Sequence, residues 1–153
     1  HIDDIDSWVN HFSLIKNVQN KTKGFTEVVP LPFVHMGSPI YLRGKSMPGP
    51  TWDEIVLIHS LARIYFVNLI DNIQASWVKL GHDGAGKLLH AGVNDLGGTL
   101  INENISRASG ADHGQETTQD QFIQIIESEN KNPVLRNTLY TEFIETKNSL
   151  EKR

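Results

Sequence analysis

Hydrophobic residues recur at helical spacing in the first half of the chain. Over residues 4–22 they form one apolar stripe, made up of Trp8, Phe12, Ile15 and Val18. Gly24 follows this stripe and predicts the end of the helix. Thr51 and Glu54 have the T-x-x-E spacing of a capping box, which predicts a second helix through about Phe66. A shorter helix is expected from residue 83 to residue 91.

Short apolar runs of strand type lie between these helices. In "FTEVVPLPF" the prolines at 30 and 32 cannot donate to a ladder, so this strand should stop near residues 29–31. "NIQASW" (72–77) and "VNDLGGTL" (93–100) predict two further strands. Alternating helices and strands are typical of a parallel sheet with right-handed crossovers. We therefore expect an α/β fold, and three strands make a reasonable half of a (β/α) barrel.

The C-terminal part is predicted to be helical. Thr118 and Gln121 have the spacing of another capping box and open a helix that Pro133 should break. A last helix is expected over about residues 134–150. Residues 1–153 as a whole are expected to form a single partial domain, with C-terminal helices over about 117–153.

Uncharged polar side chains occupy one side of the run "NIQASW". Asn72, Gln74 and Ser76 alternate with apolar residues, so they should share one face of a strand. In a barrel that face lines the lumen, and residues near the carboxyl ends of the strands meet the ligand. An alternative is that Gln74 and Ser76 satisfy each other or a buried water.

Polar residues also mark the ends of the neighbouring strands. These residues are Lys79, Asn94, Asp95, Thr99 and His35. Three strand ends of the same character favour a polar ligand. Gly97 and Gly98 could offer free amides to an anion or carboxylate, or could form a tight turn.

Two loops carry further candidates. Arg43, in the long loop after the first strand, could clamp a carboxylate or phosphate, and the loop could equally be a packing element. His113 could be a general base or a hydrogen-bond partner of a substrate, or a surface histidine. The histidines show no spacing typical of a metal site.

Composition narrows the classes of function. The formal net charge is -4 and the basic residues are scattered, which gives no reason to expect nucleic acid or an anionic membrane as partner. The chain has no cysteine, so it can form no disulfide, thiolate zinc site or iron–sulfur ligand set of its own. No apolar run approaches the roughly 20 residues of a membrane span. The acidic start "HIDDIDSW" lacks an initiating Met, which suggests a fragment.

Three longer strings carry a resemblance to a known family. They are "GFTEVVPLPFVHMGSPIYLRGKSMPGPTW", "NIQASWVKLG" and "NDLGGTLINENISRASGADHGQE". In this order they resemble the C-terminal half of the radical SAM deazaflavin synthases, the CofH-type FO synthases. The similarity is strong up to about residue 116 and looser over the final helices.

The resemblance implies the second half of a radical SAM (β/α) TIM-type barrel in a cytoplasmic transferase. In this family S-adenosylmethionine and a [4Fe–4S] cluster start radical chemistry on tyrosine. Its hydroxybenzyl group is joined to 5-amino-6-(D-ribitylamino)uracil, and a partner subunit or domain closes the deazaflavin ring of FO.

One departure from the family pattern is decisive. The family holds its cluster with a C-x-x-x-C-x-x-C motif, whereas this chain has no cysteine and matches only the region downstream of that motif. The chain alone is therefore expected to be inactive without the missing N-terminal half. Its open sheet edges and exposed lumen predict a homodimer or domain swapping.

The resemblance and the polar strand ends together suggest roles for individual residues. Residues expected to line the substrate cavity are Gln74, Ser76, Lys79, Asn94, Thr99, Glu103 and Arg43. Residues expected to bind the tyrosine amine or to move protons are Asp95, His113 and Glu116. Residues expected nearer the adenosine of the cofactor are Glu27, Pro30 and His35, and no metal ligand is expected.

The sequence is also consistent with two other functions. The chain could come from a menaquinone-pathway relative, aminofutalosine synthase or dehypoxanthine futalosine cyclase, which share parts of the same strings. It could also be a catalytically silent half-barrel that only binds a ligand or a partner subunit.

Overall fold

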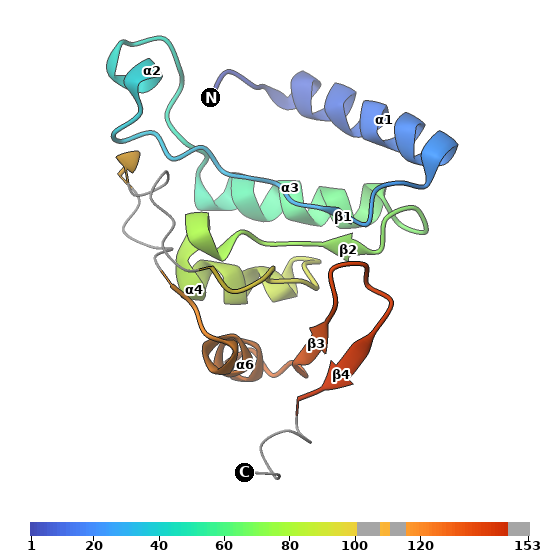
Figure 1. Ribbon diagram of the computed structural model, residues 1–153. Coiled ribbons are helices and arrows are strands. Elements are labelled where there is room, and N and C mark those ends of the chain that lie inside the picture. The colour runs from blue at the N-terminus through green and yellow to red at the C-terminus, as the bar shows by residue number, and fades with distance from the viewer. Residues whose placement is uncertain (101–107, 111–115, 147–153) are drawn as a thin grey trace.

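The computed structural model describes residues 1–100, 108–110 and 116–146. Its elements are α1 (Ile5–Thr22), β1 (Glu27–Val28), α2 (Pro39–Leu42), α3 (Trp52–Tyr65), β2 (Asn72–Ile73), α4 (Trp77–Lys87), the 3-10 turn η1 (Leu88–His90), α6 (Gln119–Ser128), β3 (Val134–Arg136) and β4 (Phe143–Glu145). In Figure 1 the β3–β4 hairpin lies below β2, whereas α1 lies above β1.

Three segments of the chain run parallel at the centre of the fold. Strand β1 pairs with β2 in parallel, with Glu27 opposite Asn72 and Val28 opposite Ile73. A parallel bridge between Gln74 and Asp95 adds the third segment beside β2. The predicted parallel direction and the mixed helix–strand class are confirmed.

The core lies between the parallel segments and the helices. Ile73 and Ala75 are fully buried, together with Phe66 at the end of α3 and Leu88 of η1. Because side chains alternate along an extended chain, Gln74 points to the opposite face. The predicted division of "NIQASW" into an apolar side and a polar side therefore holds at residues 73–75.

The helix ends follow the sequence signals. Thr51 and Glu54 form the predicted capping box of α3, and Thr118 and Gln121 form that of α6. Helix α1 ends at Lys23, which takes the left-handed conformation with φ 53° directly before Gly24. Three of the predicted helices therefore begin or end within a few residues of their expected positions.

The second and third strands are shorter than predicted. Ser76 is already the N-cap of α4, so the extended chain of "NIQASW" ends at Ala75. Helix α4 has a kink at Gly81 (φ 69°), which explains why the sequence shows only its second part as a helix. The run "VNDLGGTL" contributes only the bridge at Asp95, and Gly97 leaves the extended conformation with φ 80°.

The predicted helix over residues 134–150 is wrong. The chain instead forms an antiparallel hairpin in which Leu135 pairs with Ile144. The turn is stabilised by Asn137, whose Oδ1 accepts from the Thr141 amide at 3.0 Å and whose Nδ2 donates to Thr141 Oγ1 at 2.8 Å. Side chains that bond to nearby backbone compete with helix formation, and the helix prediction did not take the hydrogen bonding of Asn137 into account.

Within the described residues, no helix combines the length and apolar character needed to cross a membrane.

His59 provides a test of the packing between α1 and α3. It is 1% exposed, and its Nδ1 lies 2.7 Å from the Ile55 carbonyl oxygen. A carbonyl oxygen only accepts, so Nδ1 carries the proton and donates. Nε2 is therefore an unprotonated acceptor, and it has no partner among the described residues. Burial lowers the pKa of His59 and outweighs the hydrogen bond to Ile55.

We expect the free energy of unfolding to fall between pH 7.5 and pH 5.5, because the unfolded histidine, with a pKa of about 6.5, takes up a proton that folded His59 resists. His59→Asn retains a donor for Ile55 and does not titrate, so it should flatten this pH dependence in urea unfolding. His11→Asn, at an exposed position, is the matched control. The same flattening in both variants would contradict the role of His59.

Candidate functional site

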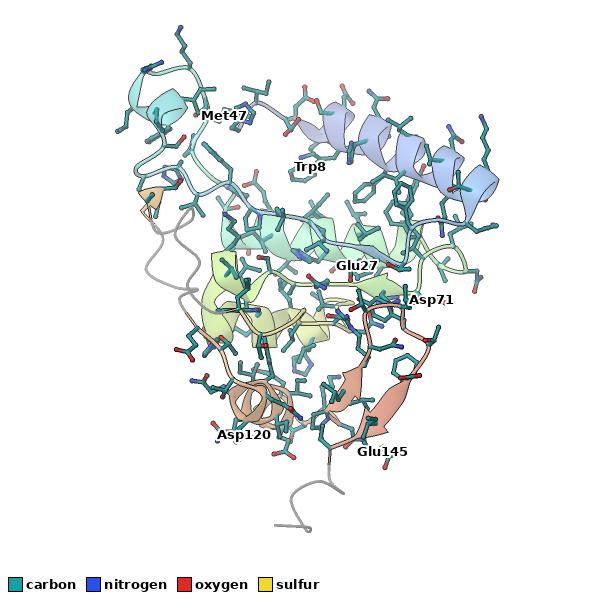
Figure 2. All side chains as sticks on the ribbon, viewed as in Figure 1. Trp8, Glu27, Met47, Asp71, Asp120 and Glu145 are labelled. Carbon is teal, nitrogen blue, oxygen red and sulfur yellow. The ribbon has the colours of Figure 1, made fainter. Side chains whose placement is uncertain are left out.

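Five polar side chains from separate parts of the chain meet on the polar face of the parallel segments. This polar cluster consists of Glu27, Gln74, Asp95, Arg136 and Tyr140. The first three come from the parallel segments, and the last two come from the β3–β4 hairpin. Figure 2 labels Glu27 on β1, next to the tip of this hairpin.

Gln74 links the two carboxylates of the cluster. Its Nε2 donates to Glu27 Oε2 at 3.1 Å and to Asp95 Oδ1 at 3.3 Å. Because carboxylate oxygens only accept, these bonds require the amide nitrogen, and not the oxygen, to face Glu27 and Asp95. The Gln74 Oε1 therefore points away from both carboxylates.

Asp95 and Arg136 form a two-pronged ion pair. Arg136 Nε donates to Asp95 Oδ2 at 2.7 Å and Nη2 donates to Oδ1 at 3.1 Å, and the Asp95 side chain is only 6% exposed. Burial alone would raise the pKa of Asp95, but hydrogen bonds from Arg136 and from the Gly97 amide (2.5 Å) lower it below its usual value. The Asp95 carboxylate raises the pKa of Arg136 in turn. Both groups are thus charged at neutral pH.

Tyr140 brings a second donor from the hairpin. Its hydroxyl donates to Glu27 Oε2, and its ring lies under Arg136, with the guanidinium carbon 4.2 Å from the ring centroid. Burial, together with the hydrogen bond to Glu27, raises the pKa of Tyr140. The phenol therefore stays protonated and continues to donate over the whole physiological pH range.

Gly97 and Gly98 lie beside the cluster, and Gly97 takes a left-handed conformation with φ 80°. The Gly97 amide is bound to Asp95 Oδ1, so it is not free to bind an anion. A Cβ at Gly97 would lie 3.2 Å from Gln74 Oε1, which shows how closely the backbone approaches this side chain. Trp77 Nε1 donates to the Gly98 carbonyl at 3.1 Å and provides a second anchor for this segment.

Several predicted site residues lie outside the polar cluster. Asn94 belongs to another hydrogen-bond group, because its Oδ1 accepts from Arg63 Nη2 at 2.6 Å and from the Ile73 amide at 2.9 Å. Ser76 is half-buried at the start of α4, and Thr99 is exposed. Asn94 and Ser76 are therefore not brought together with Gln74.

Lys79 and Glu116 line a different hollow, of about 720 Å³, between α3 and α4. Arg43 is exposed at the end of α2. The ring of His35 packs edge-on against Tyr41, and its Nδ1 accepts from the Gly49 amide at 2.7 Å.

Glu27 and Pro30 both line a cleft of about 890 Å³ between α1, β1 and α3. Glu27 is also part of the polar cluster, so the structure groups it with Gln74 and Asp95 and not with Pro30 alone. Glu103 and His113 lie outside the described residues. Within the described residues no group of three or more His, Asp or Glu side chains is arranged to hold a metal ion.

Comparison with known proteins gives the family. The model of the CofH/MqnC C-terminal region matches residues 22–150. The chain belongs to this family.

Similar full-length proteins carry consistent names. A 5-amino-6-(D-ribitylamino)uracil–L-tyrosine 4-hydroxyphenyl transferase of Methanopyrus kandleri is 51% identical over 140 residues, which is 92% of this chain and 38% of that protein. The protein of the same name from Methanothermobacter thermautotrophicus is 46% identical over 143 residues, covering 94% of this chain and 39% of that one. An FO synthase of Mycobacterium leprae is 45% identical over 140 residues, covering 92% and 16%.

This CofH/MqnC C-terminal region therefore spans well under half the length of these relatives. The resemblance predicted from the sequence is confirmed.

The hairpin residues of the cluster were missed by the sequence analysis. Arg136 and Tyr140 fall in a segment predicted to be helical, so they were not considered as partners of the strand residues. The signal present in the sequence is the turn-forming Asn137 after Arg136, and in the structure Tyr140 takes a left-handed conformation with φ 56°. A non-glycine residue with positive φ commonly marks a turn or a functional constraint.

The ion pair at the centre of the cluster can be tested with a pair of matched variants. Asp95→Asn retains the side-chain shape but leaves Arg136 with only the more distant carboxylate of Glu27, 3.8 Å away, so we expect a loss of about 2–3 kcal/mol in the free energy of unfolding. Asp83→Asn is the control, because the Asp83–Lys87 pair is far more exposed and should contribute much less. Urea unfolding of both variants measures the difference.

The effect of Asp95→Asn should also depend on pH. The pKa of folded Asp95 is lowered, so its stabilisation is present above the unfolded value of about 3.9 and is lost as the pH falls through the folded value. The gap between wild type and variant should therefore shrink on acidification below pH 4. A gap of constant size would show that the Asp95 charge contributes nothing.

Proposed function

We propose that this chain is the C-terminal part of an FO synthase, a radical SAM transferase that couples the hydroxybenzyl group of tyrosine to 5-amino-6-(D-ribitylamino)uracil. The observation that carries the proposal is the 51% identity over 140 residues to a protein named for this transfer. The full-length enzyme would use S-adenosylmethionine and a [4Fe–4S] cluster in the cytoplasm. This chain has no cysteine, so the cluster ligands would have to come from outside it.

The arrangement of β1 supports the second part of the proposal, that the chain is half of a (β/α) barrel. Among the described residues β1 pairs only with β2, so its other edge is open. Trp8, Phe12 and Phe33 line the cleft beside it, together with His59, whose Nε2 has no hydrogen-bond partner among the described residues. An open parallel edge next to an uncovered apolar surface favours a further strand at this position.

The polar cluster supports a role in binding the ribitylaminouracil. This substrate offers several N–H and O–H donors, and Gln74 Oε1 and Glu27 Oε1 accept no hydrogen bond within the described part of the chain. Asp95 is a weak base at neutral pH because its pKa is lowered, so we assign it a structural role in the wall and not proton transfer. Because Glu27 is bound to Gln74, we propose that Glu27 lies beside the ribitylaminouracil and not beside the adenosine.

Other proposed substrate contacts are Ser76, Lys79, Asn94, Thr99 and Arg43, and Glu116 is proposed to bind the tyrosine amine or to move a proton. Pro30 and His35 remain proposed neighbours of the adenosine, and Glu103 and His113 remain proposed contributors from outside the described residues. A partner subunit or domain would close the deazaflavin ring.

A full-length version of the protein tests the activity. Gln74→Ala should reduce coupling of tyrosine to the ribitylaminouracil at least tenfold, because the variant loses the amide that orients the wall. The [4Fe–4S] absorbance should be unchanged, since no cluster ligand is altered. Gln124→Ala, at an exposed position on α6, is the matched control.

The same assay separates the competing functions. Turnover of futalosine-type substrates, with none of tyrosine and the ribitylaminouracil, would reassign the chain to the menaquinone-pathway members that the family name includes. No turnover of either set would favour a silent half-barrel.

The open edge gives a prediction about assembly. We expect the isolated chain to self-associate in light scattering, and co-expression with the N-terminal part of the full-length protein to yield a 1:1 complex instead. A stable monomer of the isolated chain that does not bind the N-terminal part would contradict the half-barrel.

A further inference from the structure

We infer that the β3–β4 hairpin is a positioning element of the substrate wall, in which Arg136 fixes Asp95, Tyr140 fixes Glu27, and the two carboxylates together orient Gln74. This inference rests on the proposed function only for the identity of the substrate. The contacts themselves are those of the polar cluster.

The hairpin is held to the parallel segments mainly by polar contacts. Its apolar side chains are largely exposed: Val134 is 44% and Phe143 63% exposed to solvent. By contrast, Arg136 and Tyr140 reach across 41 and 113 residues of sequence to Asp95 and Glu27. A segment that buries little apolar surface of its own but donates hydrogen bonds to two carboxylates is suited to fixing those carboxylates.

Arg136 fixes Asp95 through the geometry of its guanidinium. Two parallel N–H bonds to the two carboxylate oxygens remove the freedom of the Asp95 side chain to rotate. Asp95 in turn binds the Gly97 amide, so the position of the Gly97–Gly98 segment depends on Arg136. Without this pair the segment, which lies against Gln74 at Gly97, would lose one of its anchors.

Tyr140 fixes Glu27 from a constrained backbone. Its φ of 56° lies in the left-handed region, which costs a non-glycine residue of the order of 1 kcal/mol. The two bonds between Asn137 and Thr141 stabilise this turn, and the Arg136 guanidinium stacks on the ring. The hydroxyl is thereby held at Glu27 Oε2 at little further entropic cost.

The consequence for Gln74 concerns specificity. Its Nε2 faces Glu27 and Asp95, so Oε1 is the atom that the side chain presents to a ligand. An acceptor at this position selects a group with an N–H or O–H donor, such as an imide N–H or a sugar-alcohol hydroxyl. If either carboxylate moved, the amide could rotate and this selection would weaken.

Two conservative substitutions in the full-length protein test the inference. Arg136→Lys retains the positive charge but not the guanidinium group that donates two hydrogen bonds to Asp95. Tyr140→Phe retains the ring that stacks on Arg136 but not the hydroxyl. We expect each to raise KM for the ribitylaminouracil about five- to tenfold, the equivalent of one lost hydrogen bond between neutral groups, with a smaller effect on kcat. Tyr65→Phe is the matched control, because it also loses one hydroxyl hydrogen bond, to Ser13, but lies away from the cluster.

Amide hydrogen exchange of the peptide covering residues 93–100 gives a readout that does not need turnover. Arg136→Lys should speed exchange there several-fold, because the Gly97 amide loses a fixed acceptor, whereas Tyr65→Phe should not. A double variant with Glu27→Gln should show that Tyr140→Phe adds little to KM once Glu27 is changed.

The outcomes separate the inference from the proposed function. Faster exchange with a raised KM supports positioning. Unchanged exchange, or faster exchange with an unchanged KM, overturns the positioning role. The hairpin would then only stabilise the fold. If the wild-type protein turns over neither substrate set, the proposed function fails, and exchange alone then decides whether Arg136 fixes the Asp95–Gly97 segment.

Discussion

The ion pair between Asp95 and Arg136 is the interaction on which the arrangement of the polar face depends. A nearly buried carboxylate is costly unless a cation and further donors satisfy it, and here a guanidinium, a backbone amide and the Gln74 amide all do so. Each of these donors comes from a different part of the chain. Satisfying one charge therefore fixes the positions of β2, of the third parallel segment with Gly97, and of the hairpin together.

The two faces of the parallel segments are consequently stabilised in different ways. On one face Ile73 and Ala75 pack into the core with Phe66 and Leu88, where burial of apolar surface is the driving force. On the other face Glu27, Gln74 and Asp95 are held by directional bonds. Directional bonds specify orientation better than apolar contacts do, which is the property a wall for a polar substrate requires.

The sequence predicts local features of this fold better than long-range ones. The helical stripe of residues 4–22 and both capping boxes depend on residues three or four apart, and these were identified. The predicted strands are too long because the N-cap at Ser76 and the left-handed conformation of Gly97 end the extended chain early. The alternation around Gln74 identified a polar face, but its partners Arg136 and Tyr140 are distant in sequence, and no periodicity links them.

The polar cluster is satisfied within the described residues, whereas the edge of β1 and the cleft under α1 are not covered by them. The charges of Asp95 and Glu27 are met by residues of this same chain, so the polar cluster does not require another segment in order to form. The open edge of β1 and the apolar cleft under α1 have no such internal partner among the described residues. If the rest of a barrel docks at that edge, it meets a wall whose side chains are already oriented, and association adds apolar burial without rearranging the polar cluster.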